Sequence, residues 1–160
     1  MPYLIDGYNL LRAVQKTEEF SELTDVQMCR AISDYLNSVR DHGHVVFDGI
    51  GPPDKAAFGG IPSLEVYFSG PSFEADDIIE DKITDNTAPK SLVVVSSDRR
   101  IRKAAAKRKA IDVPADLFWQ TLLARLEKQA NRPAPEPTEK RHGLTEREAD
   151  LWVDIFDLDS

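Results

Sequence analysis

The segment that most constrains the fold is residues 91–96, Ser-Leu-Val-Val-Val-Ser. Its centre is continuously apolar and contains three consecutive valines, a residue that favours extended backbone. A strand without alternation of apolar and polar residues is covered on both faces, as the strands of parallel sheets are. The segment therefore predicts an α/β fold with a central, mainly parallel sheet and helices on both faces.

The rest of the chain supplies alternating strands and helices, as this fold requires. Short apolar runs predict further strands at residues 3–5, 44–47, 64–68 and 111–113. Apolar residues at helical spacing predict helices at residues 25–42, 74–85, 99–109 and 114–129. Loops are expected directly after Asp6, across the polar residues 13–24, and across the Gly- and Pro-rich residues 50–62.

Composition divides the chain into three parts. Residues 1–131 hold all the predicted strands and are expected to form one domain. Residues 132–143 are polar and rich in proline, which predicts a linker. Residues 144–160 combine a capping-box sequence with an apolar stripe that includes Trp152 and Phe156, and predict an acidic amphipathic helix. This tail helix is expected to pack on the domain or on a second copy, or to dock on another partner.

Charge is distributed unevenly along the chain. The net charge is −8, and the six acids and one base of residues 144–160 contribute −5 of it. A negative protein is a poor partner for nucleic acid, because phosphate binding usually requires a positive surface. Residues 99–109, however, contain seven Lys and Arg residues. This helix is either a solvated basic face or a surface that contacts a nucleic-acid backbone.

Three features favour a protein of the cytoplasm without a membrane anchor. Cys29 is the only cysteine, so no disulfide forms within the chain, and its helical setting indicates a buried, inert thiol. The first residues lack the basic and apolar regions of a signal peptide. No stretch of the sequence approaches the ~20 apolar residues that a membrane helix needs.

Acidic residues follow the predicted strands at the points where the strands end. Asp6, Asp48 and Asp98 each come after an apolar run, and the group Glu74-Ala75-Asp76-Asp77 opens the helix after the third strand. Because the strands are parallel, these residues are expected at one edge of the sheet. Clustered carboxylates repel one another unless a hard cation such as Mg²⁺ or Mn²⁺ joins them. The pattern points to phosphodiester hydrolysis, although turn and helix-cap roles would also explain each acid singly.

At these residues the sequence resembles the PIN-like nucleases, and most closely the NYN-domain group of YacP-type bacterial endoribonucleases. The matching pieces, in family order, are LIDGYNLL (4–11), VVFDG (45–49), EADDIIE (74–80) and VVVSSDRR (93–100). The resemblance implies a PIN-like three-layer sandwich in which Asp6, Asp76 and Asp98 are catalytic metal ligands. It implies supporting roles at the site for Asn9, Asp48, Glu74, Asp77 and Ser97. It also suggests ribosome-associated mRNA as the target.

The expected mechanism is attack on the scissile phosphate by a water bound to the metal ion. The basic helix begins beside Asp98, so its first turn is expected to contact RNA phosphates through Arg99, Arg100, Arg102 and Lys103. Tyr8 is either a base-stacking residue or a packed core residue.

Three other functions compete with an endoribonuclease. A non-catalytic RNA-binding module could keep the same fold, but an unliganded acidic cluster would repel phosphate. A phosphatase of small esters usually has a D-x-D sequence after the first strand, where this chain has Asp6-Gly7-Tyr8. A DNA structure-specific nuclease needs additional gripping segments, for which a chain of 160 residues has little room.

Overall fold

The computed structural model describes residues 1–131. Residues 132–160 contain the predicted linker and tail helix, so both predictions lie outside the described residues. Within the described part, no helix combines the length and the apolar character needed to cross a membrane.

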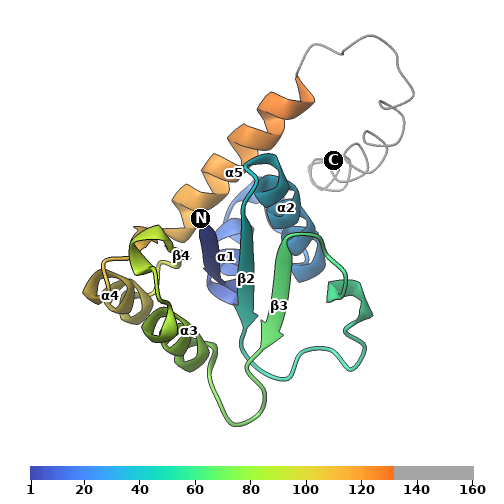
Figure 1. The fold of residues 1–160 in the computed structure, drawn as a ribbon. Helices are drawn as coiled ribbons and strands as arrows, with labels where there is room; N and C mark the ends of the chain where they lie inside the picture. Colours follow the sequence, from blue (N-terminus) through green and yellow to red (C-terminus); the bar gives the residue numbers. More distant parts are fainter. Residues whose placement is uncertain (132–160) are drawn as a thin grey trace.

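The centre of the domain is a parallel sheet of five strands in the order β3-β2-β1-β4-β5 (Figure 1). The strands, in chain order, are β1 (Pro2–Asp6), β2 (His42–Phe47), β3 (Leu64–Phe68), β4 (Val93–Val95) and β5 (Ile111–Val113). All four strand pairs are parallel. The predicted α/β fold with a parallel sheet is therefore confirmed.

Helices cover both faces of this sheet and complete three layers (Figure 1). One face is covered by α1 (Gly7–Gln15), α2 (Asp25–Ser38) and α5 (Ala115–Ala130). The other face is covered by α3 (Ala75–Asp85) and α4 (Arg99–Lys107). The strands divide their side chains between the layers, since Ile5 packs with the first group of helices and Leu4 with the second.

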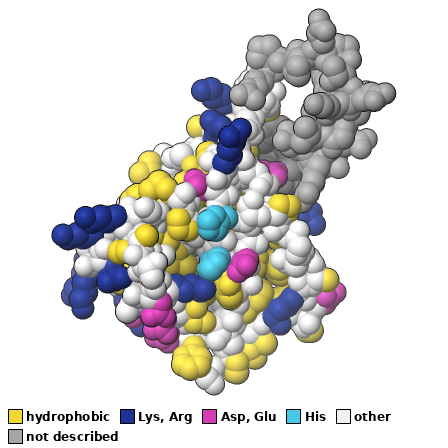
Figure 2. All heavy atoms as spheres, in the orientation of Figure 1, with side chains coloured by type: hydrophobic (Ala, Val, Ile, Leu, Met, Phe, Trp, Pro, Cys, Tyr) yellow, Lys and Arg dark blue, Asp and Glu magenta, His cyan; other side chains and the backbone are white. Residues whose placement is uncertain are grey.

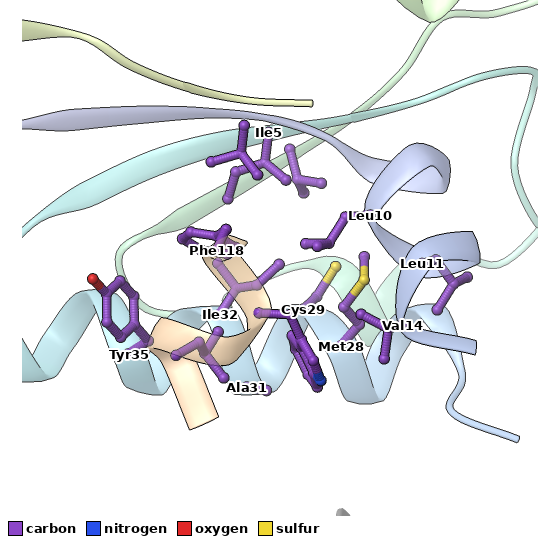
Figure 3. Close-up of a cluster of buried hydrophobic side chains, with 14 of the residues drawn as sticks. Ile5, Leu10, Leu11, Val14, Met28, Cys29, Ala31, Ile32, Tyr35 and Phe118 are labelled. Atoms are coloured by element: carbon purple, nitrogen blue, oxygen red, sulfur yellow. The ribbon is translucent and has the colours of Figure 1, made fainter. Parts of the chain in front are cut away.

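The larger core lies between the sheet and α1, α2 and α5 (Figure 3). Ile5 and Leu10 face Ile32 of α2 and Phe118 of α5, and all four side chains are at most 2% exposed. Burial of such side chains contributes roughly 1.5–3 kcal/mol each relative to exposure. Cys29 is fully buried in this core, and burial raises the pKa of its thiol, in agreement with the predicted inert role.

Three local predictions were wrong, the first because of tertiary packing and the other two because of local backbone conformation. The loop expected after Asp6 is the helix α1, because burial of Leu10, Leu11 and Val14 outweighs the weak helix propensity of Gly7 and Asn9.

The helix expected to continue to residue 42 ends at Ser38. There Arg40 adopts a positive φ of 59°, and the Asp41 N–H donates back to the Leu36 carbonyl at 2.8 Å. The strand expected at 91–96 covers only Val93–Val95, because Pro89–Ser91 form a short 3₁₀ helix. Further 3₁₀ turns at Glu18–Phe20 and Ala56–Phe58 lie within the predicted loops.

Candidate active site at the carboxyl edge of the sheet

The structure places the acidic residues that follow the strands at one edge of the sheet. Asp6 is the last residue of β1 and is in register with Val46 near the end of β2. Asp48 follows β2 directly, and Asp98 lies three residues beyond the end of β4. Asp76 lies in the first turn of α3, and its charge reaches both Asp6 and Asp98. Four elements thus contribute carboxylates to this edge.

Asp6 is the most deeply buried carboxylate of the group, with 7% of its surface exposed. Its Oδ2 accepts a hydrogen bond of 2.9 Å from the Ser96 hydroxyl. Burial raises the pKa of Asp6 from its ordinary value of 3.8 to about 6, and the charges of Asp76 and Asp98 raise it further, while the Ser96 hydroxyl and Arg12 oppose the rise. Asp6 therefore carries its negative charge at a cost to folding.

Ser96 links Asp6 to Asp98, and sequence reasoning did not single it out. Its hydroxyl oxygen accepts from the Asp98 N–H at 3.0 Å while its proton is donated to Asp6. Asp98 in turn caps α4, since its Oδ1 accepts from the Arg100 N–H at 2.8 Å. The signal in the sequence was a polar residue at the end of an apolar strand. Ser96 is fully buried, and a buried hydroxyl is expected to have hydrogen-bond partners.

The predicted supporting residues form the framework around these carboxylates. The Asn9 Oδ1 accepts from the Ser97 N–H at 2.8 Å, and the Ser97 hydroxyl accepts from the Ala115 N–H at 2.9 Å. Asp48 is exposed, and its Oδ1 accepts from the Ala75 N–H at 3.0 Å. Asp48 thereby fixes the start of α3 and hence the position of Asp76.

Arg100 joins α4 to the acidic face of α3. Its guanidinium donates to Glu80 at 2.7 and 3.0 Å and to the Asp77 Oδ1 at 2.7 Å. It also lies 3.9 Å from the Asp76 Oδ2 and 3.7 Å from the Glu74 Oε2. The hydrogen bonds from Arg100 lower the pKa values of Asp77 and Glu80, whereas the pKa of Asp76 is raised by burial and by Asp98.

The four basic residues predicted to bind RNA differ in their surroundings. Arg100 is bonded to α3, and the Arg102 Nε donates to the Asp112 Oδ2 at 3.0 Å. Arg99 and Lys103 are exposed and take part in none of the ion pairs found within residues 1–131. Tyr8 lies against Phe47, with ring centroids 4.8 Å apart, which favours its packing role.

The carboxylates at this edge are chemically suited to a hard cation, but their side chains do not converge on one point. Carboxylate oxygens are the ligands that Mg²⁺ and Mn²⁺ prefer. The pKa values of Asp6 and Asp76 are raised chiefly by burial, and the neighbouring carboxylates raise them further. As the side chains are arranged, no three His, Cys, Asp or Glu residues among 1–131 lie close enough together to form a metal site. The chemistry of the donors therefore fits the ion, although the side chains within 1–131 are not arranged around a common point.

Replacing Arg100 tests how α3 is held against α4. We expect Arg100→Gln to lower the melting temperature by a few degrees, because Asp77, Glu80 and Glu74 then repel one another without a counter-charge. Thermal melts at low and high salt measure this effect, and the deficit should shrink as salt screens the repulsion. Arg102→Gln, which breaks only the pair with Asp112, is the matched control. A deficit that salt leaves unchanged would contradict the electrostatic explanation.

The fold and this edge define the protein as a parallel α/β domain with an acidic site at the carboxyl ends of its strands. A family model described as the YacP-like NYN domain matches residues 3–155, so the chain belongs to the YacP-like NYN family. The resemblance seen in the sequence is thereby confirmed, and the domain is of the ribonuclease type.

Two solved structures support the same conclusion about the fold. A structure of Rae1 (YacP) from Bacillus subtilis has a TM-score of 0.71 and 20% identity, and the match covers 100% of this chain and 98% of that one. A structure of a variant of the same Bacillus subtilis protein has a TM-score of 0.62 and 20% identity, over 99% of this chain and 98% of that one. Among curated proteins, none matches this chain significantly.

Proposed function

We propose that this protein is a Mg²⁺- or Mn²⁺-dependent endoribonuclease that hydrolyses phosphodiester bonds within RNA. The observation that carries the proposal is the meeting of Asp6, Asp76 and Asp98 at one sheet edge, near enough for the latter two charges to act on Asp6. These residues come from β1, α3 and the segment after β4. Mutual repulsion of this kind destabilises a fold, and such arrangements cluster at functional sites.

Asp6, Asp76 and Asp98 are the residues that would hold the metal ion. When bound, the ion supplies a more acidic water and stabilises negative charge on the phosphate oxygens. The Ser96 hydroxyl orients the Asp6 carboxylate, and the Asp48 contact with Ala75 sets the start of the helix that carries Asp76. Arg99 and Lys103 supply free positive charge on α4 for the RNA backbone.

Two further features of the proposed function come from the sequence. The resemblance suggests an mRNA target on the ribosome, and the sequence favours the cytoplasm. The basic first turn of α4 would then contact the phosphates of exposed, single-stranded RNA. Contact of the tail helix with the domain or with a second copy stays a prediction.

Cleavage of a circular single-stranded RNA tests the proposal, because only an endonuclease can open a circle. We expect linear products with Mn²⁺ or Mg²⁺ and none with EDTA. Asp76→Asn should slow cleavage by about 10²-fold or more, on the scale of losing a group that stabilises transition-state charge. Asp81→Asn, an exposed acid on the same helix, is the matched control and should cleave normally. Cleavage by Asp76→Asn at the wild-type rate would contradict the proposed site.

A non-catalytic RNA-binding module is the second candidate. It is favoured by one observation, that the carboxylates of residues 1–131 are not gathered into a closed metal site. The same assay separates the two functions: retention of the circular RNA in gel shifts, with no linear product in either divalent ion, would support the binding module. A matched circular DNA substrate shows whether the site distinguishes the two nucleic acids.

A further inference from the structure

We propose that Phe73 is a stacking platform for an unpaired base of the RNA substrate, beside the carboxylate site. This inference rests on the proposed function and assigns a substrate-positioning residue to it. Aromatic rings bind single-stranded nucleic acid through base stacking, which tolerates any base because every base has a π-face.

Phe73 is not needed by the core of the domain. With 64% of its surface exposed, it is the most exposed large hydrophobic residue within 1–131. The other phenylalanines at this end of the sheet pack on one another: Phe47 lies 5.6 Å from Phe68 and 6.1 Å from Phe58, centroid to centroid. Tyr8 is occupied by Phe47 in the same way. Phe73 thus leaves most of its aromatic side chain exposed near the site.

The position of Phe73 places this ring next to the carboxylates. It directly precedes Glu74, the residue before α3, and Asp76 lies three positions further along. Figure 2 shows acidic and hydrophobic side chains side by side at the lower end of the molecule, where the loop between β3 and α3 lies in Figure 1. A base stacked on Phe73 would therefore lie within a nucleotide or two of a phosphate held at Asp76.

Hydrogen bonds anchor the loop that carries Phe73. The Gly70 N–H donates to the Gly49 carbonyl at 2.8 Å, and the Gly49 N–H donates to the Ser69 hydroxyl at 2.9 Å. At the other end of the loop, the Ala75 N–H donates to Asp48 at 3.0 Å. An aromatic residue on an anchored loop loses little conformational entropy when it binds a ligand.

The surroundings favour a nucleobase over a protein partner. Ile50, 61% exposed on the adjoining loop, and Leu117, 51% exposed in the first turn of α5, are the other strongly exposed apolar side chains of residues 1–131 near this edge. Stable protein interfaces bury roughly 800 Å² on each partner, far more than these few separate side chains provide. Glu74 directly follows Phe73, and Asp48 is bonded to Ala75, two residues beyond it. These exposed carboxylates repel phosphate, so the flat apolar face of a base is the part of RNA that fits here. The exposed cations Arg99 and Lys103 on α4 remain for the backbone.

Binding of a fluorescein-labelled single-stranded RNA oligonucleotide tests the inference, with the inactive Asp98→Asn variant used so that the RNA stays intact. We expect Phe73→Ala in this background to raise the Kd by about 10-fold, the scale of one lost aromatic–base stack. Phe73→Trp should bind as tightly as its parent, and RNA should quench the added tryptophan fluorescence. Ile111→Ala, at an apolar residue 38% exposed at the opposite edge of the sheet, is the matched control and should leave the Kd unchanged.

In the active protein, Phe73→Ala should raise KM and leave kcat near the wild-type value, because stacking binds substrate and transition state alike. An unchanged Kd in Phe73→Ala, together with unquenched fluorescence in Phe73→Trp, would overturn the inference while wild-type cleavage kept the proposed function. Absence of both RNA binding and cleavage in the wild-type protein would overturn the two together.

Discussion

Asp6→Asn should make the folded protein more stable at about pH 8 while it removes RNA cleavage. The folded state raises the pKa of Asp6 from 3.8 to about 6, chiefly through burial. A carboxyl group whose pKa is raised by folding destabilises the folded state when it is ionised, and that destabilisation disappears as the pH falls from about 6 towards 3.8. Asparagine keeps the shape of the side chain, accepts the Ser96 hydrogen bond and carries no charge.

The expected gain in the free energy of unfolding is about 2 kcal/mol. A pKa rise from 3.8 to about 6 corresponds to at most roughly 3 kcal/mol, and burial of the asparagine amide reduces this. Urea unfolding in EDTA at about pH 8 and again at about pH 4 measures the gain, which should be largely lost at the lower pH. Asp81→Asn, at an exposed residue of α3, is the matched control and should leave the free energy of unfolding at about pH 8 nearly unchanged.

Cleavage by the same variant should fall by about 10³-fold, because a group that serves charge stabilisation in the transition state is lost. Addition of Mn²⁺ should raise the melting temperature of the wild-type protein and leave Asp6→Asn unaffected, since a ligand stabilises only the state that binds it. A less stable Asp6→Asn protein at the higher pH would show that the carboxylate is compensated within the fold. In that case the proposal that ionised Asp6 destabilises the folded state would be wrong.

Much of the site could be predicted from the sequence because it depends on backbone direction. An apolar run fixes where a strand ends, and parallel pairing brings those ends to one edge. Asp6 and Asp98 were therefore located without knowledge of any side-chain contact. The start of α3 was located similarly, since helical spacing places Glu74 and Asp76 at its first turn.

The remainder depends on contacts between residues far apart in the chain. The hydrogen bond from Ser96 to Asp6 spans 90 residues, and no local pattern indicates it. The choice of Glu80 and Asp77 as partners of Arg100 follows from how α3 packs beside α4, whereas the sequence shows only a basic run. Helix α1 was missed because its first residues have weak helix propensity. Its helical conformation is stabilised by packing in the assembled core, which the local sequence does not show.

Gly7→Ala should destabilise the protein although alanine is the better helix former. A Cβ at residue 7 would lie 2.4 Å from Cδ1 and 2.5 Å from Cε1 of Phe47, closer than real Cβ contacts allow. Phe47 cannot withdraw, because it is fully buried among Tyr8, Phe58 and Phe68. Overpacking of this kind costs about 1–3 kcal/mol, more than the gain of up to about 1 kcal/mol that alanine has over glycine in a helix.

The same displacement should reach the site, because Gly7 is bonded directly to Asp6. Urea unfolding and RNA cleavage of Gly7→Ala measure the two effects, and Gly59→Ala is the matched control because its added Cβ meets only the Ala56 carbonyl at an ordinary 3.6 Å. If the clash is the cause, Gly7→Ala should cost less in a Phe47→Leu background, where a smaller side chain leaves room for the methyl group. An equal loss in both backgrounds would show that residue 7 needs glycine for a reason other than contact with Phe47. A smaller loss of stability in the Phe47→Leu background, accompanied by partial recovery of cleavage, would show that packing between Gly7 and Phe47 positions the Asp6 carboxylate.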